Sequence, residues 1–426
     1  MKRTCIWILA TAALAAACSD QGSDGAAAKT ADAPIQTTQH GGSFADLPPV
    51  QERELTPEEL EAGRNSNEWT SVVQLDTSGS GAAIRNPEKW EQITTEQMNT
   101  GAAFLPLGGD VGGPSVYRVQ ILLDRAFFSP GMMDGRWGKN TAKAVFFFQQ
   151  REGLRTSGRV DSATYDKLVE VAGRPERLVV AKTLTAEDVK GPFQELPDSI
   201  YDQAKLKCTC FETLTEKLSE TYHTSPDLLA KLNPGVDLDA LQAGQTLNVP
   251  NVRDPDARAE GEIAELVVSG RGSYLHAVDA GGRILYHFPS TLGGTYEPSP
   301  QGEFRVTAVT KNPWWHFQPA LLDKVPDDRP DAKIPPGPNN RVGAVWMTLS
   351  APHYGIHGTN TPETIGYATS AGCVRLTNWD VLFLADKVAK GTPVNFRDIQ
   401  GRTGAQDASG SGSRVDSIAR ARARGE

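Results

Sequence analysis

The amino-acid sequence predicts a multidomain protein in which a three-helix module and a small α+β module precede a β-rich domain. A chain of 426 residues is longer than one hydrophobic core usually holds. Residues 113–250 alternate short helical patterns with glycine and proline turns. From Ala264 onward the chain turns to short β-branched and aromatic segments separated by Gly, Pro or Asp, as in a β-rich sandwich or barrel.

Residues 1–17 predict a secretory signal, because two basic residues precede an apolar run that is too short to span a membrane. The string LAAAC at 14–18 is similar to a lipobox, in which Cys18 would be cleaved free and lipidated. Leu14 lies one place further from Cys18 than usual, so an ordinary signal with an incidental Cys18 is the alternative. We expect an exported protein of the periplasm or cell envelope, anchored to a membrane through the lipid on Cys18.

Residues 18–110 are expected to be mostly a disordered linker, because their first part is rich in Ala, Gly, Ser, Thr and Asp. One short helix is predicted to start at Thr56. The tail, residues 398–426, is Gly/Ser-rich and then Arg-rich, which favours a disordered basic end. No later segment is apolar for long enough to cross a membrane, and the formal net charge of −9 argues against nucleic acid as a partner.

Residues 113–171 carry the signals of three short helices. In the first, Val119, Leu122, Leu123 and Phe127 recur along one face, and the second opens at Asn140 or Thr141. The strings DGRWG, AVFFFQ and GLRTSGRVD, in this order, closely resemble the three-helix peptidoglycan-binding domain. That resemblance implies peptidoglycan as a partner.

Residues 207–250 predict two short helices, a turn at Asn233-Pro234-Gly235 and a strand at 246–249. The string LNPG and the final strand resemble a LysM module, which implies binding to N-acetylglucosamine-containing glycans. Cys208-Thr209-Cys210 stands where the first strand of such a module normally begins. The two cysteines are too close in sequence for an easy strainless bridge and too few for a strong metal site, so we expect them to be structural or incidental.

The stretch HYGIHGTNTPETIGYATSAGCVRLTNWD, residues 353–380, concentrates reactive side chains. His357 precedes Cys373 by 16 residues, and the loop between them allows the chain to bring thiol and imidazole together. A Cys–His pair is the simplest source of a thiolate at neutral pH. Gly372 leaves room for backbone N–H groups near a developing oxyanion, and Arg375 adds positive charge. After it, Asn378 is predicted to cap a helix whose core positions are Val381, Leu382, Ala385 and Val388, with Gly391 ending it.

The strings IHGTN and SAGCVRL closely resemble the active-site stretch of the L,D-transpeptidases with a YkuD-type catalytic domain. TLGG at 291–294, SPQGEF at 299–304, NPWWHF at 312–317 and IPPGPNNRVGAVWM at 334–347 agree in order, and the resemblance covers residues 263–397. Two departures stand out. Ala371 occupies a position where many members have His, and Asn340 to Gly343 read Asn-Arg-Val-Gly where Asn-Pro-Leu-Gly is usual.

The resemblance implies that Cys373 attacks a donor tetrapeptide stem of peptidoglycan, that His357 is the general base and acid, and that D-alanine leaves. Gly372, Ser370, Arg375 and Gly358 are the expected oxyanion and substrate residues. The acyl group would pass to an amine of a second stem, giving a 3→3 crosslink, or to a lysine of an outer-membrane lipoprotein. No metal and no organic cofactor is implied, and Cys373 is expected to remain a thiol. A hydrolase of the same fold (an L,D-carboxypeptidase or a peptidoglycan-lipoprotein amidase) and a non-catalytic wall-binding lipoprotein are the alternatives.

Overall fold

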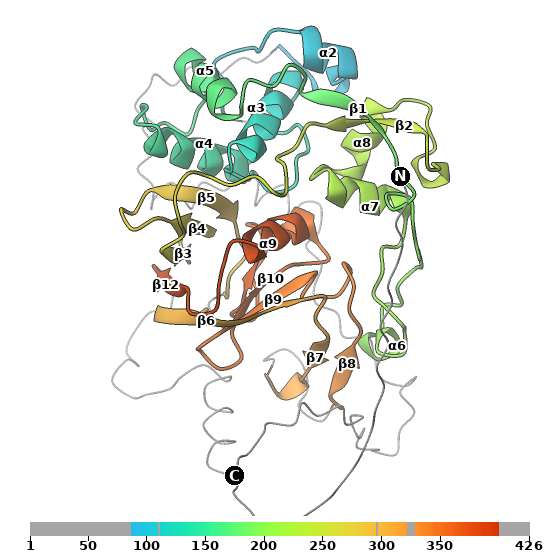
Figure 1. Cartoon of the computed structure of the whole chain (residues 1–426), viewed down its shortest axis with the longest axis vertical. Coiled ribbons are helices and arrows are strands. Elements are labelled where there is room, and N and C mark those ends of the chain that lie inside the picture. The colour runs from blue at the N-terminus through green and yellow to red at the C-terminus, as the bar shows by residue number, and fades with distance from the viewer. Residues whose placement is uncertain (1–86, 110, 295–296, 322–328, 400–426) are drawn as a thin grey trace, which may run out of the picture. The chain divides into compact units, whose positions relative to one another are not determined.

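The computed structural model describes residues 87–109, 111–294, 297–321 and 329–399. The predicted signal, Cys18, the helix at Thr56 and most of the C-terminal tail lie outside these ranges. Within them, helices, a small α+β module and a β-rich domain follow one another along the chain (Figure 1). The predicted multidomain fold class is therefore confirmed. None of the described helices combines the length and the apolar character that a membrane span requires.

The helical module consists of α3 (Pro114–Arg125), α4 (Lys139–Arg151) and α5 (Ser162–Val171). Pro114 begins α3, where a missing backbone N–H costs nothing, and Asp161 caps α5 by accepting a hydrogen bond from the Thr164 N–H. Two details of the prediction are wrong. Helix α4 begins at Lys139, before Asn140, and Phe127 lies beyond the end of α3 with a positive φ of 67°.

Part of the predicted linker is folded. Residues 90–92 form the 3₁₀ helix η3 (Trp90–Gln92), and α2 (Thr95–Thr100) follows it. Ile93 and Met98 are buried in the same hydrophobic cluster as the residues of α3. The disordered linker expected over 18–110 therefore does not extend through its last residues, because these two apolar side chains give the segment a core to join.

The α+β module contains β1 (Val179–Thr183), α7 (Leu214–Thr221), α8 (Pro226–Leu232), the 3₁₀ helix η4 (Leu238–Ala240) and β2 (Thr246–Pro250). The two helices and the second strand agree with the prediction. The first strand does not begin at Cys208, because β1 is the antiparallel partner of β2, with Val179 opposite Pro250 and Thr183 opposite Thr246. Thr213 and Ser225 cap the two helices with their side-chain oxygens.

A long insertion, residues 184–213, separates β1 from α7 and carries the short helix α6 (Ile200–Gln203). Within it a disulfide joins Cys208 and Cys210, whose Cα atoms are 5.2 Å apart. The expectation against a bridge is wrong, because this Cα separation is ordinary for a disulfide even though one residue lies between the cysteines. Ile200 and Tyr201 pack with Phe317 and Ile334 of the β-rich domain.

The β-rich domain holds an eight-stranded sheet within the described residues, in the order β11-β10-β9-β6-β12-β3-β4-β5. The strands, in chain order, are β3 (Glu265–Ser269), β4 (Tyr274–Val278), β5 (Ile284–Pro289), β6 (Gly302–Lys311), β9 (Val345–Leu349), β10 (Gly355–His357), β11 (Val374–Arg375) and β12 (Pro393–Arg397). A separate pair is formed by β7 (Trp315–Phe317) and β8 (Ala332–Ile334), and the 3₁₀ helices are η5 (Pro319–Leu321) and η6 (Pro362–Thr364). The neighbours β10 and β11, and β12 and β3, run parallel, and the other pairs are antiparallel.

Helix α9 (Asn378–Ala385) packs on this sheet. Its cap is Thr377, whose side chain accepts from the Asp380 N–H, and not Asn378 as predicted. The helix ends at Ala385, well before Gly391. Leu382, predicted for the core, is 36% exposed. The side chains of Val381, Phe383 and Leu384 are the buried ones in this part of the helix. The predicted helix is therefore present, but its bounds and its buried face differ.

The helical module is packed against the β-rich domain. Val267, Val278 and Ile284 of the sheet belong to the hydrophobic cluster that the helices build. Lys143 of α4 is only 1% exposed, and its Nζ donates a 2.7 Å hydrogen bond to the backbone oxygen of Ser273. Burial lowers the pKa of Lys143 well below its usual value, and the hydrogen bond to Ser273 compensates part of the cost of burying this polar group.

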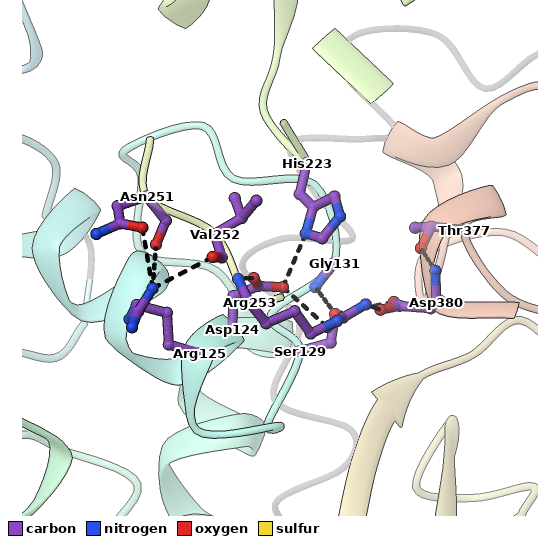
Figure 2. A network of polar contacts seen from close by, with 10 residues as sticks. All are labelled: Asp124, Arg125, Ser129, Gly131, His223, Asn251, Val252, Arg253, Thr377 and Asp380. Carbon is purple, nitrogen blue, oxygen red and sulfur yellow. Dashed lines mark hydrogen bonds and ion pairs between the residues drawn. The ribbon is translucent and has the colours of Figure 1, made fainter. Parts of the chain in front are cut away.

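A buried polar network also joins the modules, and Figure 2 shows it. Arg253, which follows β2, donates 2.8 Å and 2.5 Å hydrogen bonds to Asp124 of α3 and Asp380 of α9. The Nδ1 of His223, beyond α7, lies 3.0 Å from the Asp124 carboxylate, and Ser129 donates to Asp380 at 2.8 Å. The network thus connects all three modules through charges that compensate one another.

Candidate active site

Cys373 lies directly before β11, at the end of a tight turn. The Ser370 hydroxyl donates a 2.6 Å hydrogen bond to the Cys373 carbonyl and accepts one of 3.2 Å from the Gly372 N–H. Gly372 has a φ of +100°, and a Cβ at this position would lie 2.6 Å from Cε1 of Tyr354. Only glycine fits such a turn without displacing its neighbours. Ser370 and Gly372 therefore shape the backbone that presents the sulfur.

Hydrogen bonds from the TLGG and SPQG strings, residues 291–294 and 299–302, stabilise the turn that carries Cys373. Thr291 and Arg375 exchange backbone hydrogen bonds of 2.9 and 3.0 Å. The Ser299 hydroxyl donates to the Gly372 carbonyl at 2.7 Å and accepts from the Gly293 N–H at 3.0 Å. The motifs upstream of the cysteine thus hold its turn from the side.

His357 is the last residue of β10, the parallel neighbour of β11. In this register Ile356 lies opposite Val374, and both are fully buried in the core. Because side chains alternate along a strand, His357 and its partner Arg375 lie on the opposite face of the sheet, and Cys373 comes directly before Val374. The structure therefore places His357 at the end of β10 and Cys373 directly before the adjacent strand β11.

The tautomer of His357 follows from its contacts. Its Nδ1 lies 2.7 Å from the backbone oxygen of Gly358, and a carbonyl can only accept, so Nδ1 carries the proton. The ring stacks on Trp346, with centroids 5.2 Å apart and 20° between the planes. The remaining nitrogen, Nε2, is then the basic one, in a ring whose orientation is fixed on two sides.

The Cys373 thiol is neutral at rest. Burial raises its pKa to about 11, although a hydrogen bond from the Gly355 backbone and the charge of Arg375 act in the opposite direction. The sulfur lies 3.7 Å from the backbone oxygen of His353, a contact that a thiol proton can make. Such a thiol needs a base to become a nucleophile. Cys373 is the free cysteine of the described residues, as expected from the sequence.

Asn378, at the start of α9, organises the backbone beside His357. Its Oδ1 accepts hydrogen bonds from the N–H groups of Ala344, at 3.0 Å, and Thr359, at 3.3 Å. A Cβ on Gly358 would come within 2.3 Å of this oxygen, so glycine permits the close approach. Gly358, predicted as a substrate residue, contacts His357 in the structure, because its carbonyl accepts from Nδ1 of that ring.

The other end of Asn378 reaches the α+β module. Its Nδ2 donates to the Pro338 carbonyl at 3.0 Å and to both carboxylate oxygens of Glu220, each at 3.1 Å. Sequence reasoning missed Glu220, because one carboxylate near the end of a short helix looks like an ordinary surface charge. Its partner lies 158 residues further along the chain, so no local signal pointed to the pair.

The loop that reads Asn-Arg-Val-Gly is braced by its own asparagine. Asn340 is fully buried, and its Nδ2 donates to the Pro335 carbonyl at 2.8 Å while its Oδ1 accepts from the Val342 N–H at 3.1 Å. The loop is therefore ordered without the usual proline. Among the described residues, no three His, Cys, Asp or Glu side chains gather in a way that would hold a metal ion.

Comparisons with known proteins match three parts of the chain. Residues 264–396 match the L,D-transpeptidase catalytic domain of the YkuD type, 112–168 a peptidoglycan-binding domain and 215–250 a LysM domain. These matches confirm the three resemblances predicted from the sequence.

Proteins similar in sequence support the match to the catalytic domain. The chain is 34% identical over 185 residues to a Bacillus licheniformis protein named as the L,D-transpeptidase YkuD, which covers 43% of this chain and 93% of that protein. It is 30% identical over 179 residues to the protein of the same name from Bacillus subtilis, covering 42% and 90%. A crystal structure of an L,D-transpeptidase from Xylanimonas cellulosilytica covers 69% of this chain and 98% of that one at 15% identity, with a TM-score of 0.30 from which no shared arrangement follows.

Proposed function

This chain belongs to the L,D-transpeptidase family with a YkuD-type catalytic domain, and from that premise we propose that Cys373 and His357 carry its acyl transfer. The enzyme is an L,D-transpeptidase, and its peptidoglycan-binding and LysM domains indicate peptidoglycan as substrate in the cell envelope. The observation that supports the proposal is the pairing of β10 with β11, in which His357 lies opposite Arg375 and the neutral thiol of Cys373 comes directly before β11.

The proposed chemistry has two half-reactions. Nε2 of His357 takes the Cys373 proton as the sulfur attacks the carbonyl carbon of the diaminopimelate residue in a donor tetrapeptide stem. The carbon–nitrogen bond to the terminal D-alanine breaks, the imidazolium protonates the leaving amine, and a thioester remains. An acceptor amine then attacks the thioester, passes its proton to His357 and releases the thiol.

The surrounding residues support these steps in different ways. Arg375 lowers the pKa of the thiol through its positive charge, so it favours the thiolate. Gly358 holds the imidazole, whereas Ser370 and Gly372 fix the turn that carries Cys373. We propose that the acceptor is the side-chain amine of another stem, giving a 3→3 crosslink, with a lipoprotein lysine as the alternative acceptor.

The nucleophile is tested with Cys373→Ala and a carbapenem, which is expected to acylate this cysteine. The variant adds no volume to a glycine-flanked turn, so it should fold, and it should form no adduct by mass spectrometry. Wild type should gain the mass of one carbapenem. An adduct that persists in the variant would identify another residue as the nucleophile.

Digestion of sacculi and separation of the muropeptides tests the acceptor. New 3→3 crosslinked dimers that require Cys373 support transfer to an amine. Tripeptide stems that accumulate without new crosslinks would instead show that water is the acceptor, as in a hydrolase of the same fold.

We also propose that the protein is a lipoprotein, on the evidence of residues 1–18. If Cys18 carries lipid, the mature protein should sediment with membranes, and Cys18→Ser should release it into the soluble fraction. Immunoblotting of the two fractions measures this. Equal partitioning of the two forms would remove the lipid anchor and leave the catalytic proposal untouched.

A further inference from the structure

A continuous chain of hydrogen bonds runs from the LysM domain to the proposed base. It starts at Glu220, near the end of α7, which accepts from Nδ2 of Asn378. The Oδ1 of the same amide accepts from the Thr359 N–H. That N–H belongs to the peptide whose carbonyl, on Gly358, accepts from Nδ1 of His357.

The direction of every bond in this chain is fixed by chemistry. Backbone N–H groups of Ala344 and Thr359 can only donate, so the Asn378 atom that faces them is its oxygen, and its NH₂ group must face Glu220. At the far end the Gly358 carbonyl can only accept. Each donor therefore points toward Glu220, the arrangement in which hydrogen bonds polarise one another in series.

We propose that Glu220 is a positioning residue for His357, acting through Asn378 and the peptide between Gly358 and Thr359. The proposal rests on the function proposed above, because it assumes that His357 is the base. When Glu220 is a carboxylate, it draws the Asn378 amide proton toward itself, and the polarisation passes along the chain. The Gly358 carbonyl then accepts more strongly from Nδ1, which makes Nε2 a stronger base.

The surroundings of Glu220 make this effect adjustable by pH. Burial raises its pKa to about 8, the hydrogen bond from Asn378 acts against this, and the negative charges of Glu216 on α7 and Glu363 on η6 raise it further. The carboxyl group is consequently neutral in acid and ionises as the pH rises through the range near 8. We expect the support of His357 to follow this ionisation.

The coupling from Glu220 to His357 through these hydrogen bonds, which we call the relay, is tested by NMR on the full-length protein. This measurement does not depend on enzymatic activity. In wild type, the Thr359 amide and the His357 ring nitrogens should show a titration step near pH 8, the pKa of Glu220. Glu220→Gln keeps an acceptor of the same shape and removes the charge, so this step should vanish while the fold, followed by circular dichroism, is retained. A step that persists in this variant, or is absent in wild type, would overturn the relay.

The consequence for catalysis is read from the rate of Cys373 acylation by a carbapenem between pH 6 and pH 10. The ratio of the wild-type rate to the Glu220→Gln rate should be near one in acid. The ratio should rise about two- to tenfold above pH 8, because each hydrogen bond between Glu220 and His357 should become roughly 10–30% stronger. A ratio that stays flat would overturn the proposal, because a purely structural role of Glu220 would not follow its ionisation.

Two matched variants sharpen the result. Glu216→Gln removes a charge that raises the pKa of Glu220, so the rise in rate should remain and begin at lower pH. Glu170→Gln removes an exposed carboxylate on α5 and should leave the profile of the wild type unchanged. The failure of this proposal can be distinguished from the failure of the proposed function. If the NMR titration step is present but no carbapenem acylates the protein, the effect of Glu220 on His357 stands and Cys373 is not the nucleophile.

Discussion

Two polar contacts reach the first turn of α9 from the modules that precede the catalytic domain, and they differ in how charge is compensated. At Asp380, Arg253 lies between two carboxylates, and His223 and Ser129 complete the network (Figure 2). At Asn378, two residues earlier, the carboxylate of Glu220 meets a neutral amide and has Glu216 and Glu363 nearby. The first contact holds the modules together at any moderate pH, whereas the second depends on its state of protonation.

The two contacts therefore respond to pH in opposite directions. Burial alone would raise the pKa of Asp124, but the charges of Arg253 and His223 outweigh it and hold that pKa well below its usual range. A depressed folded pKa gives stability that is present above the unfolded pKa, near 4, and is lost in acid. The raised pKa of Glu220 has the reverse sign, because the native state binds its proton more tightly than the unfolded chain does.

The largest expected effect comes from breaking the compensated contact. Arg253→Leu leaves Asp124 and Asp380 as buried carboxylates without their cation, and should lower the free energy of unfolding by about 3–5 kcal/mol. Denaturant unfolding of the full chain measures it. Arg258→Ala, at an exposed arginine five residues on, is the matched control and should stay within about 0.5 kcal/mol of wild type. A similar loss for both variants would mean that the network contributes no specific stability.

A smaller effect, with a characteristic pH dependence, is expected at Glu220. Between the unfolded pKa and about 8, the folded state binds more protons than the unfolded state, so wild-type stability falls as the pH rises. Glu220→Gln has no proton to lose. The variant should lie closest to wild type near pH 5 and exceed it at pH 8.5 by roughly 2–4 kcal/mol, because each unit of pKa shift corresponds to about 1.4 kcal/mol. Parallel curves of Tm against pH for the two proteins would contradict the raised pKa.

The smallest change in stability is expected at an exposed ion pair, which serves as the reference for the Arg253 and Glu220 variants. Lys190 and Glu187 form an ion pair of 3.0 Å in which both side chains are largely exposed. Lys190→Ala should change the free energy of unfolding by no more than about 0.5 kcal/mol at any pH between 5 and 9, because solvent screens such pairs. If Lys190→Ala lowered the free energy of unfolding as much as Arg253→Leu, burial of an ion pair would not determine its contribution to stability in this protein.

The sequence predicted the parts of the site whose signals are local. Cys373, its flanking glycine and His357 lie within one short stretch, and the pairing of β10 with β11 aligns the two segments that carry them. Helix α9 was also predicted, but with the wrong cap, because Thr377 and Asn378 are adjacent and both are capable of capping. Only the backbone conformation decides which residue accepts from the next turn.

The parts that were missed depend on contacts between distant segments. The strand β1 pairs with β2 across the insertion and the two helices, and nothing in Val179–Thr183 indicates that partner. Leu382 fits a helical period, yet α9 is covered by Phe383 and Leu384 instead, so tertiary packing overrides the pattern. Glu220 has no local sequence mark at all, because its meaning depends on Asn378.

The insertion before α7 has a consequence for how the enzyme is made. Thr209 donates to the Pro336 carbonyl and accepts from the Asn339 N–H, each at 3.0 Å, and Tyr201 donates to the Pro330 carbonyl at 3.2 Å. The insertion therefore braces residues 335–339 from outside the catalytic domain, and an independently produced catalytic domain would have to order that loop without it.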